Sequence, residues 1–251
     1  MTPLAPDTVL VAFLMFCRIG GCLMLMPGFS SPRIPMQVRL FIAIAVTLAM
    51  TPVLLPTLQG SVKDLSFPVL CGLILSETAV GALIGVIGRM FFLALQFMAT
   101  AAAQFIGLAG MPGTPIEDTE PLPAVATLIT LTATVFLFLT DQHWEVFKAL
   151  AASYSVLPIT EPFSIEAGLK NLSGAVGDAF VLALQISSPF VVYGIIINLL
   201  FGFANKMIPQ IPIYFISLPF VLAGGFLLLY FTVSEFLTLF MAGFMNWLIR
   251  G

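Results

Sequence analysis

The stretch PVLCGLILSETAVGALIGVIGRMFFLALQFMATAAAQFIG, Pro68 to Gly107, is an apolar run with no proline after its first residue and no cluster of turn-forming residues. Such a run predicts helix throughout. At 1.5 Å per residue the helix would be about 60 Å long, roughly twice the ~30 Å hydrocarbon thickness of a bilayer. The stretch is therefore either two spans joined by a hidden bend or one long helix that leaves the membrane plane.

The whole chain has the composition of an integral membrane protein. Of its 251 residues, 60% are hydrophobic and 8% are charged, whereas soluble domains carry about 25% charged residues. A spanning helix needs about 20 apolar residues, so we expect an all-α membrane protein with one integral domain, residues 1–251, and about six apolar segments. No basic region precedes the first apolar run, which we therefore expect to remain as a span. The net charge of −3 is too small to indicate nucleic-acid binding.

Prolines and polar links divide the chain into these segments. We expect them at residues 8–29, 40–58, 68–107, 124–139, 175–203 and 213–247, with a further apolar stretch that ends near residue 157. The longest polar link, residues 158–171, precedes the fifth segment, and Pro209 and Pro212 interrupt the helix before the sixth. Lysine and arginine are spread evenly over alternate links, so the charge bias does not predict the orientation.

One face of the long third segment carries a charge followed by glycines. Glu77, Gly81, Gly85 and Gly88 share this face, and glycines at this spacing allow another helix to approach closely. We therefore expect Glu77 to face a tight helix interface and not lipid. Arg89 is too far along a straight helix to pair with Glu77, so each needs a partner elsewhere. Such charges are either structural ion pairs within the bundle or charges that face a conduit.

Polar residues at helical spacing form stripes on three segments. The stripes are Gln96, Thr100 and Gln104; Thr127, Thr130 and Thr134; and Asn198, Gly202 and Asn205. The first two stripes lie on the two arms of a hairpin. They either form hydrogen bonds between helices of one bundle or face a water-containing passage.

The tip of that hairpin is the loop IGLAGMPGTPIEDTEPLP, Ile106 to Pro123. It is rich in glycine and proline, and it holds Glu117, Asp118 and Glu120, three of the twelve acidic residues of the chain. A loop of this polarity does not fit in hydrocarbon but is tolerated where it lines a water-filled cavity. The alternative is an ordinary exposed connector between two spans.

Residues that carry catalysis are sparse. The single histidine, His143, lies beside Trp144 and is expected to be a hydrogen-bonded structural residue. Cys17, Cys22 and Cys71 match no metal-binding spacing. We expect no enzyme, no metal and no cofactor. A small transporter or ion channel that uses Glu77, Arg89 and Asp178 as pathway charges is an alternative, but the halves of the chain show none of the repeats usual in transporters.

Three blocks together resemble the FliR family of flagellar biosynthesis proteins and its type III secretion counterparts, the SctT group. They are FCRIGGCLMLMPGFSSPRIPMQVRL from Phe16, SETAVGALIGVIGRMFFLALQFMATAAAQFIGLAG from Ser76, and LLFGFANKMIPQIPIYFISLPFVLAGG from Leu199. The most specific piece is the pattern N-basic-x-x-P-Q in the third block, and the resemblance covers nearly the whole chain. Lys206 departs from the family, in which arginine is commoner at this position.

The resemblance implies a subunit of the flagellar type III protein export gate in the bacterial inner (cell) membrane, at the flagellar basal body. A virulence-type secretion gate is the close alternative. One such subunit joins several FliP and FliQ subunits as stacked, kinked helical hairpins in a helical assembly. FlhB and FlhA, unfolded export substrates and membrane lipid are the further partners implied.

The resemblance also assigns roles to residues. The channel plug corresponds to Gly107, Gly110, Met111, Pro112, Gly113, Thr114, Pro115, Ile116, Glu117, Asp118 and Glu120. The residues expected to serve assembly and packing are Arg18, Glu77, Gly81, Gly85, Arg89, Asn205, Lys206, Pro209 and Gln210. The stripes that contain Gln96 and Thr127 would then face the conduit.

Overall fold

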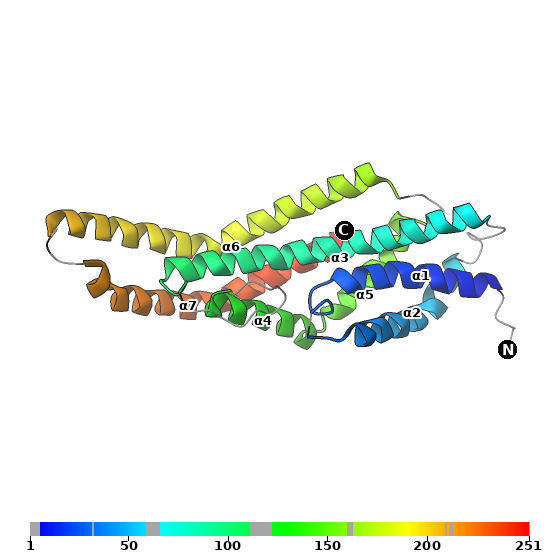
Figure 1. Ribbon diagram of the computed structural model, residues 1–251, viewed down its shortest axis with the longest axis horizontal. Coiled ribbons are helices and arrows are strands. Elements are labelled where there is room, and N and C mark those ends of the chain that lie inside the picture. Colours follow the sequence, from blue (N-terminus) through cyan, green and yellow to red (C-terminus); the bar gives the residue numbers. More distant parts are fainter. Residues whose placement is uncertain are drawn as a thin grey trace. The chain divides into compact units, whose positions relative to one another are not determined.

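The computed structural model describes residues 6–31, 33–58, 66–110, 122–159, 163–208, 210 and 213–250. These residues form helices and no strand (Figure 1). The helices are α1 (Pro6–Leu25), α2 (Met36–Leu58), α3 (Phe67–Phe105), α4 (Ala124–Leu139), α5 (His143–Val156), α6 (Ile165–Met207) and α7 (Ile213–Arg250). Within the described ranges, five helices are long and apolar enough to cross a membrane, and six spans result if α4 and α5 together make one. The prediction of an all-α membrane protein is confirmed.

The long third segment is one uninterrupted helix of 39 residues. The hidden bend that would have made it two spans does not occur, because the only proline of the helix, Pro68, lies in its first turn, where a backbone donor has no partner within the helix. The helix ends where Gly107 adopts a left-handed φ of 79°. There the Leu108 N–H donates to the Ala103 carbonyl and the Gly107 N–H to the Gln104 carbonyl, so the end is a Schellman motif.

Several helix ends differ from the sequence-based expectation. α6 begins at Ile165, ten residues before the expected start, so the end of the polar link is helical. Ser164 initiates α6, since its Oγ accepts a hydrogen bond from the Ala167 N–H at 3.3 Å. α1 ends at Leu25 instead of residue 29, because a turn follows in which Gly28 has a φ of 84°. The expected limits followed the polarity of each stretch alone. The observed limits depend on single residues, Ser164 before α6 and Gly28 after α1.

The described residues pack as two compact units. The first is Met1–Met90, Thr140–Gly177 and Met245–Gly251, and the second is Phe91–Leu139 and Asp178–Phe244. In the first unit, α1 lies between α2, α5 and the first part of α3, and its buried side chains fill the core. The core residues from α1 are Val11, Leu14, Met15, Ile19 and Leu23.

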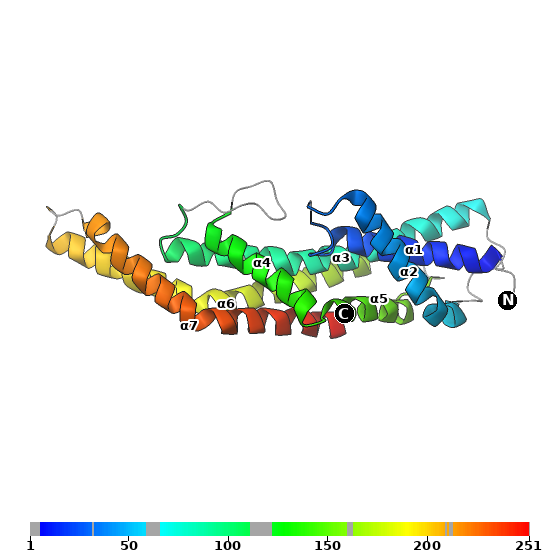
Figure 2. The same cartoon turned by 90° about the horizontal axis from the view of Figure 1, so that it is seen from below.

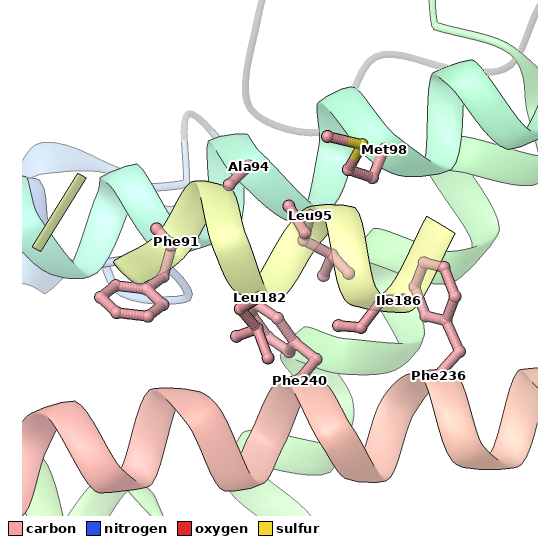
Figure 3. A pocket seen from close by; sticks show the side chains of 10 residues that line it. Phe91, Ala94, Leu95, Met98, Leu182, Ile186, Phe236 and Phe240 are labelled. Carbon is pink, nitrogen blue, oxygen red and sulfur yellow. The ribbon is translucent and has the colours of Figure 1, made fainter. Parts of the chain in front are cut away.

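The second unit packs the end of α3 against the middle of α6 and α7, as Figures 1 and 2 both show. Figure 3 shows Leu95, Leu182 and Phe240, one from each helix, with their side chains turned toward one another. The space among these residues has no room for a water molecule. The rings of Phe92 and Phe240 meet edge to face with centroids 5.2 Å apart, a favourable aromatic geometry. This contact is therefore a packed core and not a binding site.

Glycines bring α3 into backbone contact with α1. A Cβ atom on Gly81 would overlap the backbone of Arg18, and one on Gly85 would lie 2.6 Å from the Cys22 carbonyl oxygen. From the other side, a Cβ on Gly21 would lie 2.8 Å from the Thr78 carbonyl oxygen. These three positions leave no space for any side chain, so the two helices approach as closely as their backbones allow.

Gly81→Leu tests this contact. Overpacking usually costs about 1–3 kcal/mol, and here the loss of stability should reach at least the upper end because the obstructing atoms are backbone. The matched control is Gly72→Leu on the same helix, where a Cβ meets nothing within 4 Å. Thermal unfolding of the purified chain in mild detergent should show a large drop for the first variant and little change for the second. Equal transitions for both would contradict the close approach.

Candidate functional site

Arg18 and Glu77 form a buried ion pair between α1 and α3. The Arg18 Nε donates to Glu77 Oε2 at 2.7 Å, and Nη2 donates to Oε1 at 2.8 Å. Each side chain is only 1% exposed. Two parallel bonds of this kind give the strongest geometry that an arginine and a carboxylate can adopt.

The end of α5 completes the surroundings of Arg18. Nη1 donates to Ser153 Oγ at 3.0 Å, and Nη2 donates to the Leu157 carbonyl at 2.8 Å. The Tyr154 ring lies against the guanidinium, with the Arg18 Cζ 3.9 Å from the ring centroid, at a distance suited to a cation–π contact. Four of the five Arg18 N–H groups thus have acceptors among the described residues.

This cluster is suited to holding helices together. A buried charge is costly unless it is paired and its remaining donors are satisfied; here Arg18 is paired and four of its five N–H groups have acceptors. Both Glu77 carboxylate oxygens accept hydrogen bonds from Arg18, so the two charges compensate each other. Two alternatives were open for Glu77: a structural ion pair, or a charge that faces a conduit. The geometry fits the structural ion pair. The buried cluster therefore fastens α1, α3 and α5 within the first unit.

A second candidate site is a groove in the second unit. It has a volume of about 480 Å³. Residues from the end of α3, the end of α6 and the start of α7 line it: Gln104, Phe105, Gly107, Ile197, Asn198, Phe201, Gly202, Asn205, Ile213, Ser217, Leu218 and Val221. We call it the amide groove, because three of these residues carry side-chain amides on otherwise apolar helices.

Local structure explains how the amide groove is built. Asn198, Gly202 and Asn205 follow one face of α6 at helical spacing. The Schellman end of α3 places Gln104 and Gly107 beside this face. Tyr193 Oη donates to the Val221 carbonyl at 2.7 Å and so links α6 to α7 next to the lining residue Val221. The groove therefore lies between two linked helices, and its three amide side chains are exposed.

The stripes predicted to face a conduit have different surroundings in the structure. Gln104 is exposed, whereas Gln96 and Thr100 are half-buried on the same helix. On α4, Thr127 and Thr130 are buried and Thr134 is half-buried. The Thr130 hydroxyl donates to the Ala126 carbonyl at 2.9 Å, within its own helix. Thr127 and Thr130 are thus buried inside the subunit, and the hydrogen bond of Thr130 lies within one helix and not between helices.

The structure places the other predicted residues as follows. Arg89 and His143 are half-buried, and Asp178, Lys206 and Gln210 are exposed. The described part of the chain contains no group of three or more His, Cys, Asp or Glu side chains that could hold a metal ion. Of the predicted plug, Gly107 and Gly110 are described and exposed. Met111, Pro112, Gly113, Thr114, Pro115, Ile116, Glu117, Asp118 and Glu120 lie outside the described residues, as does Pro209.

The structure also brings together residues that the sequence did not connect. Gln104, Gly107 and Asn205 were predicted separately as conduit, plug and assembly residues, and all three line the amide groove. Ser153 and Tyr154, which contact Arg18, were not predicted at all. The charges of α5, Glu145 and Lys148, pair with each other near the start of the helix, so no charge beside Ser153 and Tyr154 indicated a buried partner.

Comparison with known proteins identifies the class. A family model described as bacterial export proteins, family 1, matches residues 9–247 and so includes both the buried cluster and the amide groove. The chain is 26% identical to the flagellar biosynthetic protein FliR of Caulobacter vibrioides over 226 residues, which cover 90% of this chain and 89% of that protein. It is 28% identical to FliR of Escherichia coli (strain K12) over 214 residues, which cover 83% and 78%.

A third relative, FliR of Pectobacterium carotovorum subsp. carotovorum, is 25% identical over 215 residues, covering 85% of this chain and 80% of that protein. The match to the family model extends over nearly the whole chain. The chain therefore belongs to this family of bacterial export proteins, within the group formed by FliR. It is a multi-pass, all-α membrane protein.

Variants of the ion pair measure its contribution to stability. Glu77→Ala should lower the free energy of unfolding by about 3–5 kcal/mol, because Arg18 stays buried without a counter-charge. Glu77→Gln retains one acceptor oxygen and should cost less. The double variant Arg18→Met with Glu77→Leu removes both charges and should be more stable than Glu77→Ala. Unfolding of the detergent-purified chain is the measurement. A double variant as unstable as Glu77→Ala would show that lost packing, and not an unpaired charge, causes the effect.

Proposed function

We propose that the chain is a structural and gating subunit of the flagellar type III protein export gate. The match of the export-protein family to residues 9–247 is the observation that carries this proposal. The relatives named above are flagellar biosynthetic proteins, which favours the flagellar system over a virulence-type one. In this role the chain works in the inner membrane at the flagellar basal body, with FliP and FliQ as direct partners and FlhB and FlhA nearby.

The apolar surface supports assembly with partner subunits. On the last part of α6, large exposed side chains form one broad apolar face: Ile195, Ile196, Leu199, Leu200 and Phe203. An exposed apolar surface of this kind is covered by lipid or protein. α3 alone is about 58 Å long, so it would need a tilt of about 60° to fit in a ~30 Å hydrocarbon layer, beyond the usual range of 0–40°. Hairpins of partner subunits are the cover that such helices require.

The paired charges argue against a transporter. A transport pathway uses ionisable groups that can exchange partners with ions or substrate. Glu77 instead gives both oxygens to Arg18, and α3 has no break at this point. The Arg18–Glu77 pair therefore supports a structural role, as expected of an export-gate subunit.

The loop that follows α3 is proposed as the channel plug. The Schellman end at Gly107 turns the chain out of the helix beside the amide groove. A loop with many glycines and prolines suits a narrow bore, since glycine permits unusual backbone angles and proline limits flexibility. The acidic residues near the end of the loop would be hydrated by the channel or its mouth.

The end of α6 should be an assembly element. Lys206 and Gln210 are exposed there and do not line the amide groove, so their polar groups are available to partner subunits. Gln210→Ala should reduce recovery of FliP and FliQ with the chain by about fivefold or more, the equivalent of one lost hydrogen bond. Pro209→Ala should also reduce it, because the restored backbone N–H allows the helix to continue where proline interrupts it. The measurement is native mass spectrometry of the complex in mild detergent.

Gln185→Ala is the control for these variants, because Gln185 is an exposed glutamine within α6, away from its end. It should leave the complex unchanged. Normal recovery for both Pro209→Ala and Gln210→Ala would contradict the role of this helix end. A wild-type chain that purifies without FliP and FliQ, as a stable monomer with solute flux, would overturn the proposed function itself.

Deletion of Gly110 to Pro115 tests the plug. The closed state must open reversibly, and a shift from about 1% to about 99% open needs only about 5.5 kcal/mol of differential binding. Shortening the loop should therefore raise the permeability of the inner membrane to small ions or dyes while FliP and FliQ still assemble with the chain. An assembled complex without added leak would favour the exposed-connector alternative.

A further inference from the structure

We propose that the amide groove binds the main chain of an extended, uncharged segment of export cargo. This inference rests on the proposed export function and names a binding site within it. Gly107 is the proposed plug residue that also lines the groove, and every residue used below belongs to α3, α6 or α7.

The lining chemistry selects a neutral ligand that both donates and accepts hydrogen bonds. None of the described lining residues carries a charge. Gln104, Asn198 and Asn205 supply amides, which contain two donors and one acceptor oxygen each. A phosphate or carboxylate would find no counter-charge in the groove, and a lipid tail would leave the amides unpaired. A peptide group has the same donor and acceptor character as the side-chain amides, so it can satisfy them.

The spacing of the amides fits an extended chain. Asn198 and Asn205 are seven residues apart on α6, which places them about 10.5 Å apart along the helix axis. An extended chain rises about 3.4 Å per residue, so the two amides are separated by about three of its residues. Asn198 is held in place, because one of its N–H groups donates to the Gly194 carbonyl at 2.8 Å. Phe105, Phe201 and Leu218 supply apolar contacts between the amides for uncharged side chains.

The groove has the size and openness of a binding site. Its volume of about 480 Å³ lies within the range of about 300–1,000 Å³ found for small-ligand sites. Gly202 lies between the two asparagines, and a Cβ atom placed there meets nothing within 4 Å. The missing side chain thus keeps the middle of the groove open. A larger residue at this position would fill the groove without a clash inside the subunit.

Gly202→Leu is therefore a direct test. It should slow secretion of a flagellar export substrate into the medium by about tenfold or more. A small misfit between a ligand and its pocket changes the preference for that ligand by a factor of this size. Recovery of FliP and FliQ with the chain should stay normal. The matched control is Gly177→Leu, since Gly177 is also an exposed glycine of α6 whose Cβ would meet nothing within 4 Å. This control should export at the wild-type rate.

Two outcomes of that experiment overturn the proposal. Normal export by Gly202→Leu in a normal complex shows that no cargo uses the groove. Loss of FliP or FliQ from the Gly202→Leu complex shows that the groove is a surface for a partner subunit. Both outcomes leave the proposed function intact, because that function is tested on the wild-type chain, by its recovery of FliP and FliQ and by its restoration of export to a strain that lacks it.

Photocrosslinking identifies the occupant. A photoreactive amino acid at position 202 should form an adduct with an export substrate that is arrested during secretion, and one at position 177 should not. The probe is used in the full complex with FliP and FliQ. An adduct at position 202 with FliP, FliQ or lipid alone, in cells where the arrested substrate is present, overturns the assignment of the groove to cargo.

Discussion

The fold depends on the cost of placing a charge in an apolar protein. The Arg18 side chain is buried, so it needs a carboxylate from another helix and acceptors for its remaining N–H groups. Glu77 supplies the charge, and α5 supplies a hydroxyl, a carbonyl and an aromatic face. These partners lie in sequence-distant helices, so one guanidinium determines which helices of the first unit meet. The glycines beside it remove the side chains that would hold those helices too far apart.

Much of the fold could be predicted from the sequence, because apolar length and proline content are local properties. The limits of α4 were predicted to the residue, and α3 was expected as a single long helix or a bent pair. The early start of α6 was missed, because a polar stretch such as residues 165–174 can be helical once Ser164 caps it. Polarity shows whether a segment suits lipid, but not whether it is helical.

The candidate sites were harder to predict, because they depend on contacts between distant segments. The face with Glu77 and its glycines could be recognised from spacing alone, but its partner Arg18 could not, since charge pairing leaves no local pattern. Likewise, the residues of the amide groove were each noticed for a different reason, and only the fold shows that Gln104 and Asn205 line one surface. Threonine spacing was a weaker guide, because a threonine hydroxyl can donate to its own helix and then pack in the interior.

The distance of 59 residues between Arg18 and Glu77 has a consequence for biogenesis. Arg18 leaves the ribosome first, and at a synthesis rate of about 5–20 residues per second Glu77 follows about 3–12 seconds later. During this interval an unpaired Arg18 in the bilayer core costs at least about 2.5–3.5 kcal/mol, so α1 is less stable there than it becomes once α3 arrives. The ion pair thus makes the stability of the first helix depend on a helix that is synthesised later, and a chain whose synthesis stops within this interval lacks the partner of its arginine.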